Sequence, residues 1–96
     1  MTAKIEITEK DSENFIIKVQ GSSTTTHTVT VTDSHIQNLT NGNMTKKELL
    51  RFSFQFLLER EPNTSILSEF KIDVIGQYFP EYKRKLQESI SNTNQI

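Results

Sequence analysis

The only two imidazoles in the sequence belong to His27 and His35. His27 stands among threonines and valines that alternate along the chain, and His35 closely follows Asp33. A protein metal centre needs three or four ligands at a spacing that brings them together, and no third ligand accompanies these histidines at such a spacing. We therefore expect no bound metal. We interpret His27 as a strand residue and His35 as a residue on a helix surface.

Other arrangements that support catalysis are missing from the sequence. The chain has no cysteine, so it offers no thiolate nucleophile, disulfide or cysteine-bound metal. Its serines lack the G-x-S-x-G motif, and its glycines stand too far apart to form a phosphate-binding loop. Glu59 and Glu61 flank Arg60, which is typical of a solvated ion-pair cluster rather than of a general acid and base. We expect a protein that is not an enzyme, with no cofactor and no small-molecule ligand.

The charges of the chain are balanced, with 11 basic and 12 acidic residues and a formal net charge of −1. Nonspecific nucleic-acid binding depends on Lys and Arg side chains that neutralise phosphates. The basic residues form two small clusters, at 46–51 and 83–85, which we interpret as solvated faces. No apolar run approaches the roughly 18–20 residues of a membrane span, and the N-terminal stretch does not resemble a signal peptide. The expected location is the cytoplasm, without nucleic-acid or membrane partners.

The first third of the chain alternates between apolar and polar residues, as half-buried antiparallel strands do. The alternation covers residues 4–10, 15–20 and 24–32, and polar turns separate the three stretches. On the last stretch, His27 shares one face with two valines, and threonines occupy the other face. The sequence predicts a three-stranded antiparallel meander.

Helical spacing replaces the alternation after the third stretch. Asp33 is expected to cap a short helix over 34–40. Thr45 and Glu48 have the spacing of a capping box, in which each side chain accepts a hydrogen bond from the backbone of the other residue. The pattern therefore predicts a helix over 46–61, ended by the proline that follows.

The C-terminal third is also predicted to be helical. Residues 65–79 carry apolar side chains at helical spacing but contain Gly76, which indicates two short helices rather than one. Pro80 suits the first turn of a last helix over 81–90. Residues 91–96 are polar and are predicted to be a frayed tail.

The central helix is unusually apolar. On a helical wheel its polar stripe is only roughly 80° wide and consists of Glu48, Arg51, Gln55 and Glu59. Such a helix must be covered on two sides. The sheet and the segment after residue 65 can supply both covers, or part of the apolar arc can form a homodimer interface. Ser53 lies within the arc, where its small side chain permits a neighbouring element to approach closely.

Part of this pattern resembles the ribbon-helix-helix repressors. From Thr24 to Glu61 the expected order is strand, short helix, turn and longer helix. In that family, paired strands of a dimer enter the DNA major groove, so the resemblance implies a DNA-binding or antitoxin-like regulator. This sequence departs from the family in three ways. The first helix is short, threonines replace base-reading side chains on the strand, and two more strands precede it.

A second resemblance covers most of the chain from Thr26 to Tyr82. It rests on the stretch Ser53 to Pro62, which reads SFQFLLEREP, on Ser65 to Leu67, which reads SIL, and on Tyr78 to Tyr82, which reads YFPEY. In these stretches the chain is similar to a family of small uncharacterised bacterial proteins. The resemblance implies a small cytoplasmic α+β protein and assigns no activity.

Taken together, residues 1–90 are predicted to form a single α+β domain, in which the meander packs on a helical layer. The predicted function is a non-enzymatic protein–protein interaction module, and the alternative is the ribbon-helix-helix type of regulator. The partner is another protein or a second copy of the chain. We expect the interaction surface near the C-terminal helices, where Gly76 and Pro80 interrupt regular packing. Its predicted residues are Ile72, Ile75, Phe79 and Tyr82.

Overall fold

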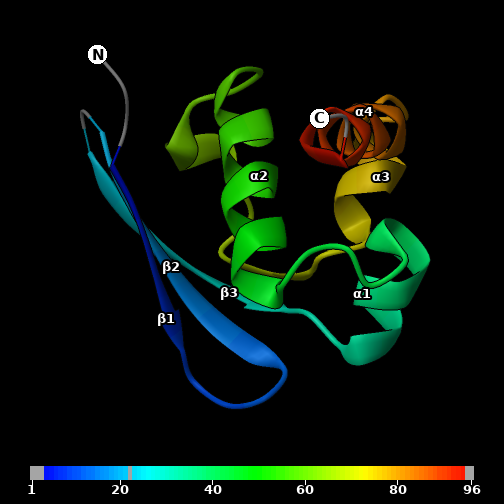
Figure 1. Cartoon of the computed structure of the whole chain (residues 1–96). Helices are drawn as coiled ribbons and strands as arrows, with labels where there is room; N and C mark the ends of the chain where they lie inside the picture. The colour runs from blue at the N-terminus through cyan, green and yellow to red at the C-terminus, as the bar shows by residue number, and fades with distance from the viewer. Residues whose placement is uncertain (1–3, 22, 95–96) are drawn as a thin grey trace.

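A four-stranded sheet forms one layer of the molecule, and all the helices lie on one of its faces (Figure 1). The computed structural model describes the backbone of residues 4–21 and 23–94 and, within these ranges, the side chains as far as Ile90. The strands follow each other across the sheet in the order of the sequence, from β1 to β4. The predicted α+β class is therefore confirmed.

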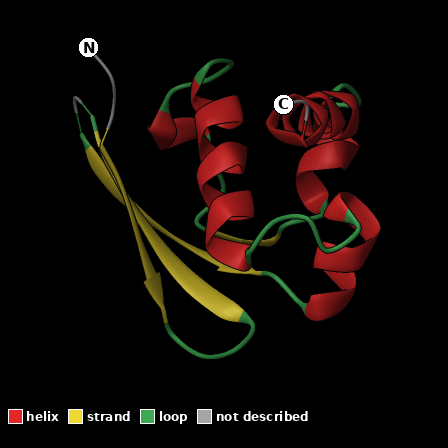
Figure 2. Ribbon diagram, in the orientation of Figure 1, coloured by secondary structure: helices red, strands yellow, loops and turns green. Residues whose placement is uncertain are grey.

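The first three strands form the predicted antiparallel meander. They are β1 (Lys4–Glu9), β2 (Asn14–Gln20) and β3 (Thr24–Thr30). The apolar positions of β2 alternate, and its residues Phe15, Ile17 and Val19 are all buried under the helices. Among the described residues, no helix covers the opposite face of the sheet (Figure 2), which suits the threonines that β3 places there.

The segment after α2 corrects the prediction for residues 65–79. Instead of two short helices, the chain forms a single 3-10 turn, η1 (Asn63–Ser65), then a strand, β4 (Glu69–Lys71), and one short helix, α3 (Val74–Tyr78). β4 runs parallel to β3 and places Phe70 opposite Val29. The spacing of apolar residues does not identify such a strand. β4 forms because its backbone pairs with β3, a strand distant in sequence whose edge offers unsatisfied hydrogen-bonding groups.

The first helix, α1 (Asp33–Thr40), begins one residue earlier than predicted. Its N-cap is Thr32 rather than Asp33, which corrects the expected cap. The Thr32 hydroxyl accepts from the His35 N–H at 3.2 Å, and the Thr32 N–H donates to Nδ1 of His35 at 3.1 Å. His35 thus takes the position that Glu or Gln usually holds in a capping box. Asn41, at a left-handed φ of 54°, ends the helix.

The central helix, α2 (Lys46–Leu58), begins with the predicted capping box. The Glu48 N–H donates to the Thr45 hydroxyl at 3.1 Å, and the Thr45 N–H donates to Oε1 of Glu48 at 2.8 Å. The helix ends at Leu58, before the predicted end at residue 61. The residues that precede Pro62 form a turn, in agreement with the steric effect of proline on its predecessors.

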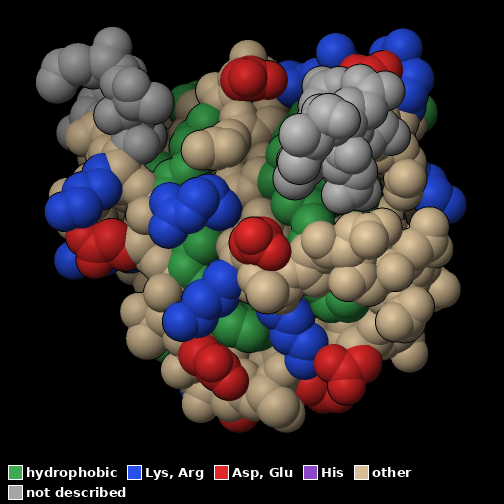
Figure 3. All heavy atoms as spheres, in the orientation of Figure 1, with side chains coloured by type: hydrophobic (Ala, Val, Ile, Leu, Met, Phe, Trp, Pro, Cys, Tyr) green, Lys and Arg blue, Asp and Glu red, His purple; other side chains and the backbone are tan. Residues whose placement is uncertain are grey.

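Both covers of α2 come from the same chain (Figure 2). On the sheet side, the ring of Phe54 lies 5.4 Å from the ring of His27, measured between centroids. On the other side, the ring of Phe56 lies 5.8 Å from Phe79 and 5.2 Å from Tyr82. The apolar arc of α2 is therefore covered without a second copy. The expected polar stripe is exposed, and Figure 3 shows acidic and basic side chains interspersed on this face.

The last helix, α4 (Tyr82–Asn94), buries Tyr82, Leu86 and Ile90. The side chain of Gln87 donates to the backbone carbonyl of Leu39 at 2.8 Å and so joins α4 to α1. The backbone stays helical beyond the predicted end at residue 90, and residues 95–96 of the expected tail lie outside the described residues. Within the described part of the chain, no helix is long and apolar enough to cross a membrane.

Candidate interaction site

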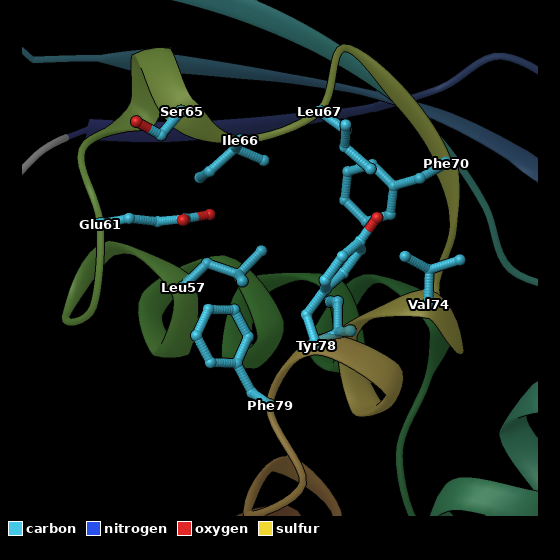
Figure 4. A pocket seen from close by; sticks show the side chains of 10 residues that line it. Leu57, Glu61, Ser65, Ile66, Leu67, Phe70, Val74, Tyr78 and Phe79 are labelled. Atoms are coloured by element: carbon cyan, nitrogen blue, oxygen red, sulfur yellow. The ribbon is translucent and has the colours of Figure 1, made fainter.

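A cavity of about 340 Å³ opens between the C-terminal end of α2, the segment around β4 and the helix α3 (Figure 4). Its size is near the lower end of the range of ligand pockets. The wall is mostly apolar, and its polar side chains come from Glu61, Ser65 and Tyr78. The apolar lining residues are Leu57, Ile66, Leu67, Phe70, Val74, Ile75 and Phe79.

Two large apolar side chains at this pocket are exposed to solvent. Leu67 has an exposed fraction of 48% and Tyr78 one of 67%, and no other large hydrophobic side chain among the described residues is classed as exposed. In Figure 4, the Tyr78 ring extends across the pocket toward Leu67 and Phe70. The exposed apolar surface is thus concentrated at one place, which is typical of a surface that binds a partner.

The carboxylate of Glu61 points into the pocket from the opposite wall (Figure 4). The Glu61 residue is half-buried. Among the residues that the structure describes, no hydrogen bond or ion pair engages this carboxylate. The neighbouring cation, Arg60, is directed elsewhere, because its Nε donates to Glu81 at 3.0 Å.

His27 holds the wall of the pocket in place. Its Nδ1 lies 2.7 Å from the carbonyl oxygen of Leu67, and a carbonyl only accepts, so Nδ1 carries a proton. Its Nε2 lies 2.8 Å from the Thr25 hydroxyl, which can donate to it. The sequence correctly places His27 on a strand, but its contact with the distant Leu67 has no local signal.

Asn63 is a second buried anchor that sequence reasoning missed. Its side-chain amide donates to the carbonyl of Ser23 at 3.0 Å and to the hydroxyl of Thr25 at 2.9 Å. These bonds join η1 to Ser23, just before β3, and to Thr25 within β3. Asn63 and His27 meet at Thr25, so one polar network ties the start of the pocket wall to the sheet.

The buried hydroxyls of Ser53 and Tyr82 form a structural pair between α2 and α4. The Ser53 hydroxyl donates to the carbonyl of Leu49 at 2.6 Å, so the Tyr82 hydroxyl donates to Ser53, also at 2.6 Å. Burial raises the pKa of Tyr82 to about 12. A neutral phenol and a serine whose proton is engaged by a carbonyl have no free nucleophile to offer.

Arg60 and Glu81 form a further ion pair, at the ends of α2 and α4. The guanidinium of Arg60 also stacks on Phe56, with its central carbon 3.6 Å from the ring centroid. The pKa of Glu81 is lowered, mainly by a hydrogen bond from its own backbone and then by the bond from Arg60. This arrangement confirms that Arg60 belongs to an ion-pair cluster, whereas Glu61 is separate from it.

The residues of the predicted interaction surface do not lie together on the surface of the protein. Ile72, Ile75 and Tyr82 are buried in the core, so they do not form an exposed patch, and this corrects the expected exposure. The Ile72 N–H donates to the carbonyl of Thr30 on β3, and this backbone pairing places the Ile72 side chain in the core. Phe79 is half-buried and lines the pocket together with Ile75. The exposed apolar side chains are instead their neighbours Leu67 and Tyr78.

The histidines do not form part of a metal site in the described residues. Nε2 of His35 lies 3.8 Å from Oδ1 of Asp73, which links α1 to the start of α3. No group of three or more His, Cys, Asp or Glu side chains in the described ranges could hold a metal ion. The candidate site is therefore the apolar pocket.

Comparisons with known proteins do not identify this chain. No protein-family model matches it, and searches of curated proteins and of solved structures found no match either.

Proposed function

We propose that the protein is a non-enzymatic interaction module, and that its pocket binds a segment of a partner protein. The observation that carries this proposal is the apolar pocket of about 340 Å³ with exposed Leu67 and Tyr78 at its mouth. Tyrosine is enriched at protein interfaces, because its ring buries a large area and loses little conformational entropy. The hydrogen bond between His27 and the Leu67 carbonyl holds the backbone at one side of the pocket mouth, which reduces the ordering that binding requires there.

The state of the reactive side chains supports a module rather than an enzyme. His27, Ser53 and Tyr82 are all buried and engaged in hydrogen bonds. They are also absent from the pocket lining. A general base or nucleophile must reach the substrate to act on it.

The pairing of β3 favours the module over the ribbon-helix-helix type of regulator. A repressor of that type uses a strand that pairs with its equivalent in a second copy. In this chain, β3 pairs with β2 on one side and with β4 on the other. Within one molecule, β2 therefore occupies one edge of β3 along its whole length, and β4 occupies the other edge at Thr28 to Thr30.

Affinity enrichment from extracts of the source cells tests the proposal when pocket and control variants are compared. We expect the wild-type chain to retain a specific protein that Leu67→Asp does not retain, because a charge at the mouth would oppose apolar contact. Thr26→Asp, on the exposed outer face of the sheet, is the matched control and should retain it. Equal retention by all three chains would contradict a role for the pocket.

Gel-shift titration with random and promoter DNA at 50 and 200 mM salt tests the alternative. A protein that makes 6–10 phosphate contacts loses about 10³–10⁵ in affinity over this salt range. We expect no such binding. Tight and salt-sensitive binding would favour the regulator over the module.

A further inference from the structure

The unengaged carboxylate of Glu61 gives the pocket a chemical preference. It is half-buried and lines a wall that is otherwise mostly apolar. A carboxylate that is partly removed from water is stabilised by a cation that donates a charge-assisted hydrogen bond. In the described part of the chain, nothing provides this cation.

The adjacent Arg60 shows why the chain does not neutralise Glu61 itself. Its guanidinium is bound to Glu81 and to the backbone carbonyl of Phe56, each at 3.0 Å, and it stacks on the Phe56 ring. A further contact joins the guanidinium to Glu59 at 3.3 Å, so Arg60 is engaged by groups other than Glu61. The carboxylate in the pocket therefore remains available to a ligand.

We propose that the partner segment carries a large apolar side chain directly beside a Lys or Arg. The apolar side chain occupies the pocket between Leu67 and Tyr78, and the cation meets Glu61. A cavity of about 340 Å³ has room for one or two side chains rather than for a long helix. This inference rests on the proposed function and adds the chemical class of the partner.

NMR titration of the isotope-labelled protein with blocked hexapeptides at low salt provides the test. The first probe has the sequence Ala-Lys-Leu-Phe-Lys-Ala. A second replaces both lysines with glutamate, a third replaces them with serine, and a fourth keeps the lysines but replaces Leu-Phe with Ala-Ala. We expect the first peptide to shift the backbone signals of Leu67 and Tyr78 and to bind about five-fold tighter than the serine peptide.

Two variants assign the preference to one carboxylate. Glu61→Gln should abolish the advantage of the lysine peptide over the serine peptide while leaving binding of the serine peptide unchanged. Glu88→Gln is the matched control, because Glu88 is an exposed carboxylate on α4 that does not line the pocket, and it should keep the full preference. Thermal unfolding of each variant checks that the fold is intact.

The possible outcomes separate this inference from the function on which it rests. Equal affinity for the lysine, serine and glutamate peptides would overturn the cation preference and leave the peptide-binding module in place. Binding of the Ala-Ala peptide as tightly as the first would overturn the apolar anchor. Absence of binding by every peptide would overturn both proposals. A dimer in light scattering that Tyr78→Ala dissociates would assign the pocket to a second copy and also overturn the inference.

Discussion

The hydroxyls of Tyr82 and Ser53 meet at 2.6 Å between the helices α4 and α2. Tyr82 is fully buried, and its ring contacts both Phe52 and Phe56. Ser53 leaves room for this approach, because its side chain is much smaller than those of Phe52 and Phe54 beside it. At this scale, the sequence predicts that Ser53 permits a close approach, and the structure identifies Tyr82 as the neighbour.

Tyr82 should make the stability of the protein sensitive to alkaline pH. The pKa of the Tyr82 hydroxyl is about 12 in the folded chain, whereas the ordinary value for tyrosine is 10.0. Between these values the folded state keeps the proton and the unfolded state releases it. The contribution of Tyr82 to the free energy of unfolding is therefore fully present below pH 10 and falls by roughly 1.4 kcal/mol per pH unit up to about pH 12. Urea unfolding of wild type and Tyr82→Phe at pH 8 and pH 11 measures this, since only the wild type should show the contribution from Tyr82. Equal losses in both chains would contradict it.

Asn63 should contribute to stability through its buried amide. Asn63→Ala removes the donor to the Ser23 carbonyl and the Thr25 hydroxyl, and should lower the free energy of unfolding by about 1–3 kcal/mol. Thr64→Ala, at the next and exposed position, should change it by less than about 0.5 kcal/mol. Denaturant unfolding of both variants decides the matter, and similar midpoints would mean that the amide has no structural role.

At the scale of elements, the sequence is most informative where the determinants are local. The capping box of Thr45 and Glu48 and the polar stripe of α2 lie within one helix, so spacing alone predicts both. The alternation that predicts the meander is likewise contained in each strand. β4 differs, because its three residues become a strand only by pairing with Thr28 to Thr30 on β3.

The same distinction explains why the candidate site was only partly predictable. The region after α2 could be identified by its interrupted apolar pattern. The side chains that point outward could not be identified from the pattern, because the pairing of β4 places Ile72 in the core and leaves Leu67 exposed. The orientation of Leu67 depends on a hydrogen bond to His27, 40 residues earlier in the chain.

The capping box should contribute measurably to the stability of α2. Thr45→Ala leaves the Glu48 N–H without its side-chain acceptor and should cost about 1 kcal/mol. Thr45→Ser keeps the acceptor oxygen and should retain most of the stability. Chemical unfolding of the two variants provides the comparison. An unfolding free energy for Thr45→Ala equal to that of wild type would show that water replaces the cap at no cost.

At the scale of the whole molecule, α2 holds two layers together. The sheet contacts it through Phe54, and the C-terminal helices contact it through Phe56. A chain of 96 residues has a modest core, so its stability is expected near the lower end of the usual range of about 5–15 kcal/mol. Loss of one ring at this junction is therefore large relative to the total.

Phe56→Ala should lower the free energy of unfolding by about 3–5 kcal/mol, because it leaves a cavity beside Phe79 and Tyr82 and removes the ring under Arg60. Gln55→Ala, at the adjacent exposed position on α2, should change it by less than about 0.5 kcal/mol. Urea unfolding followed by circular dichroism measures both variants. Since α2 joins the two layers, we expect Phe56→Ala to destabilise sheet and helices in one cooperative transition. Equal midpoints for the two variants would contradict the position of Phe56 in the core, and a separate early loss of helical signal would show that the sheet is stable without the C-terminal helices.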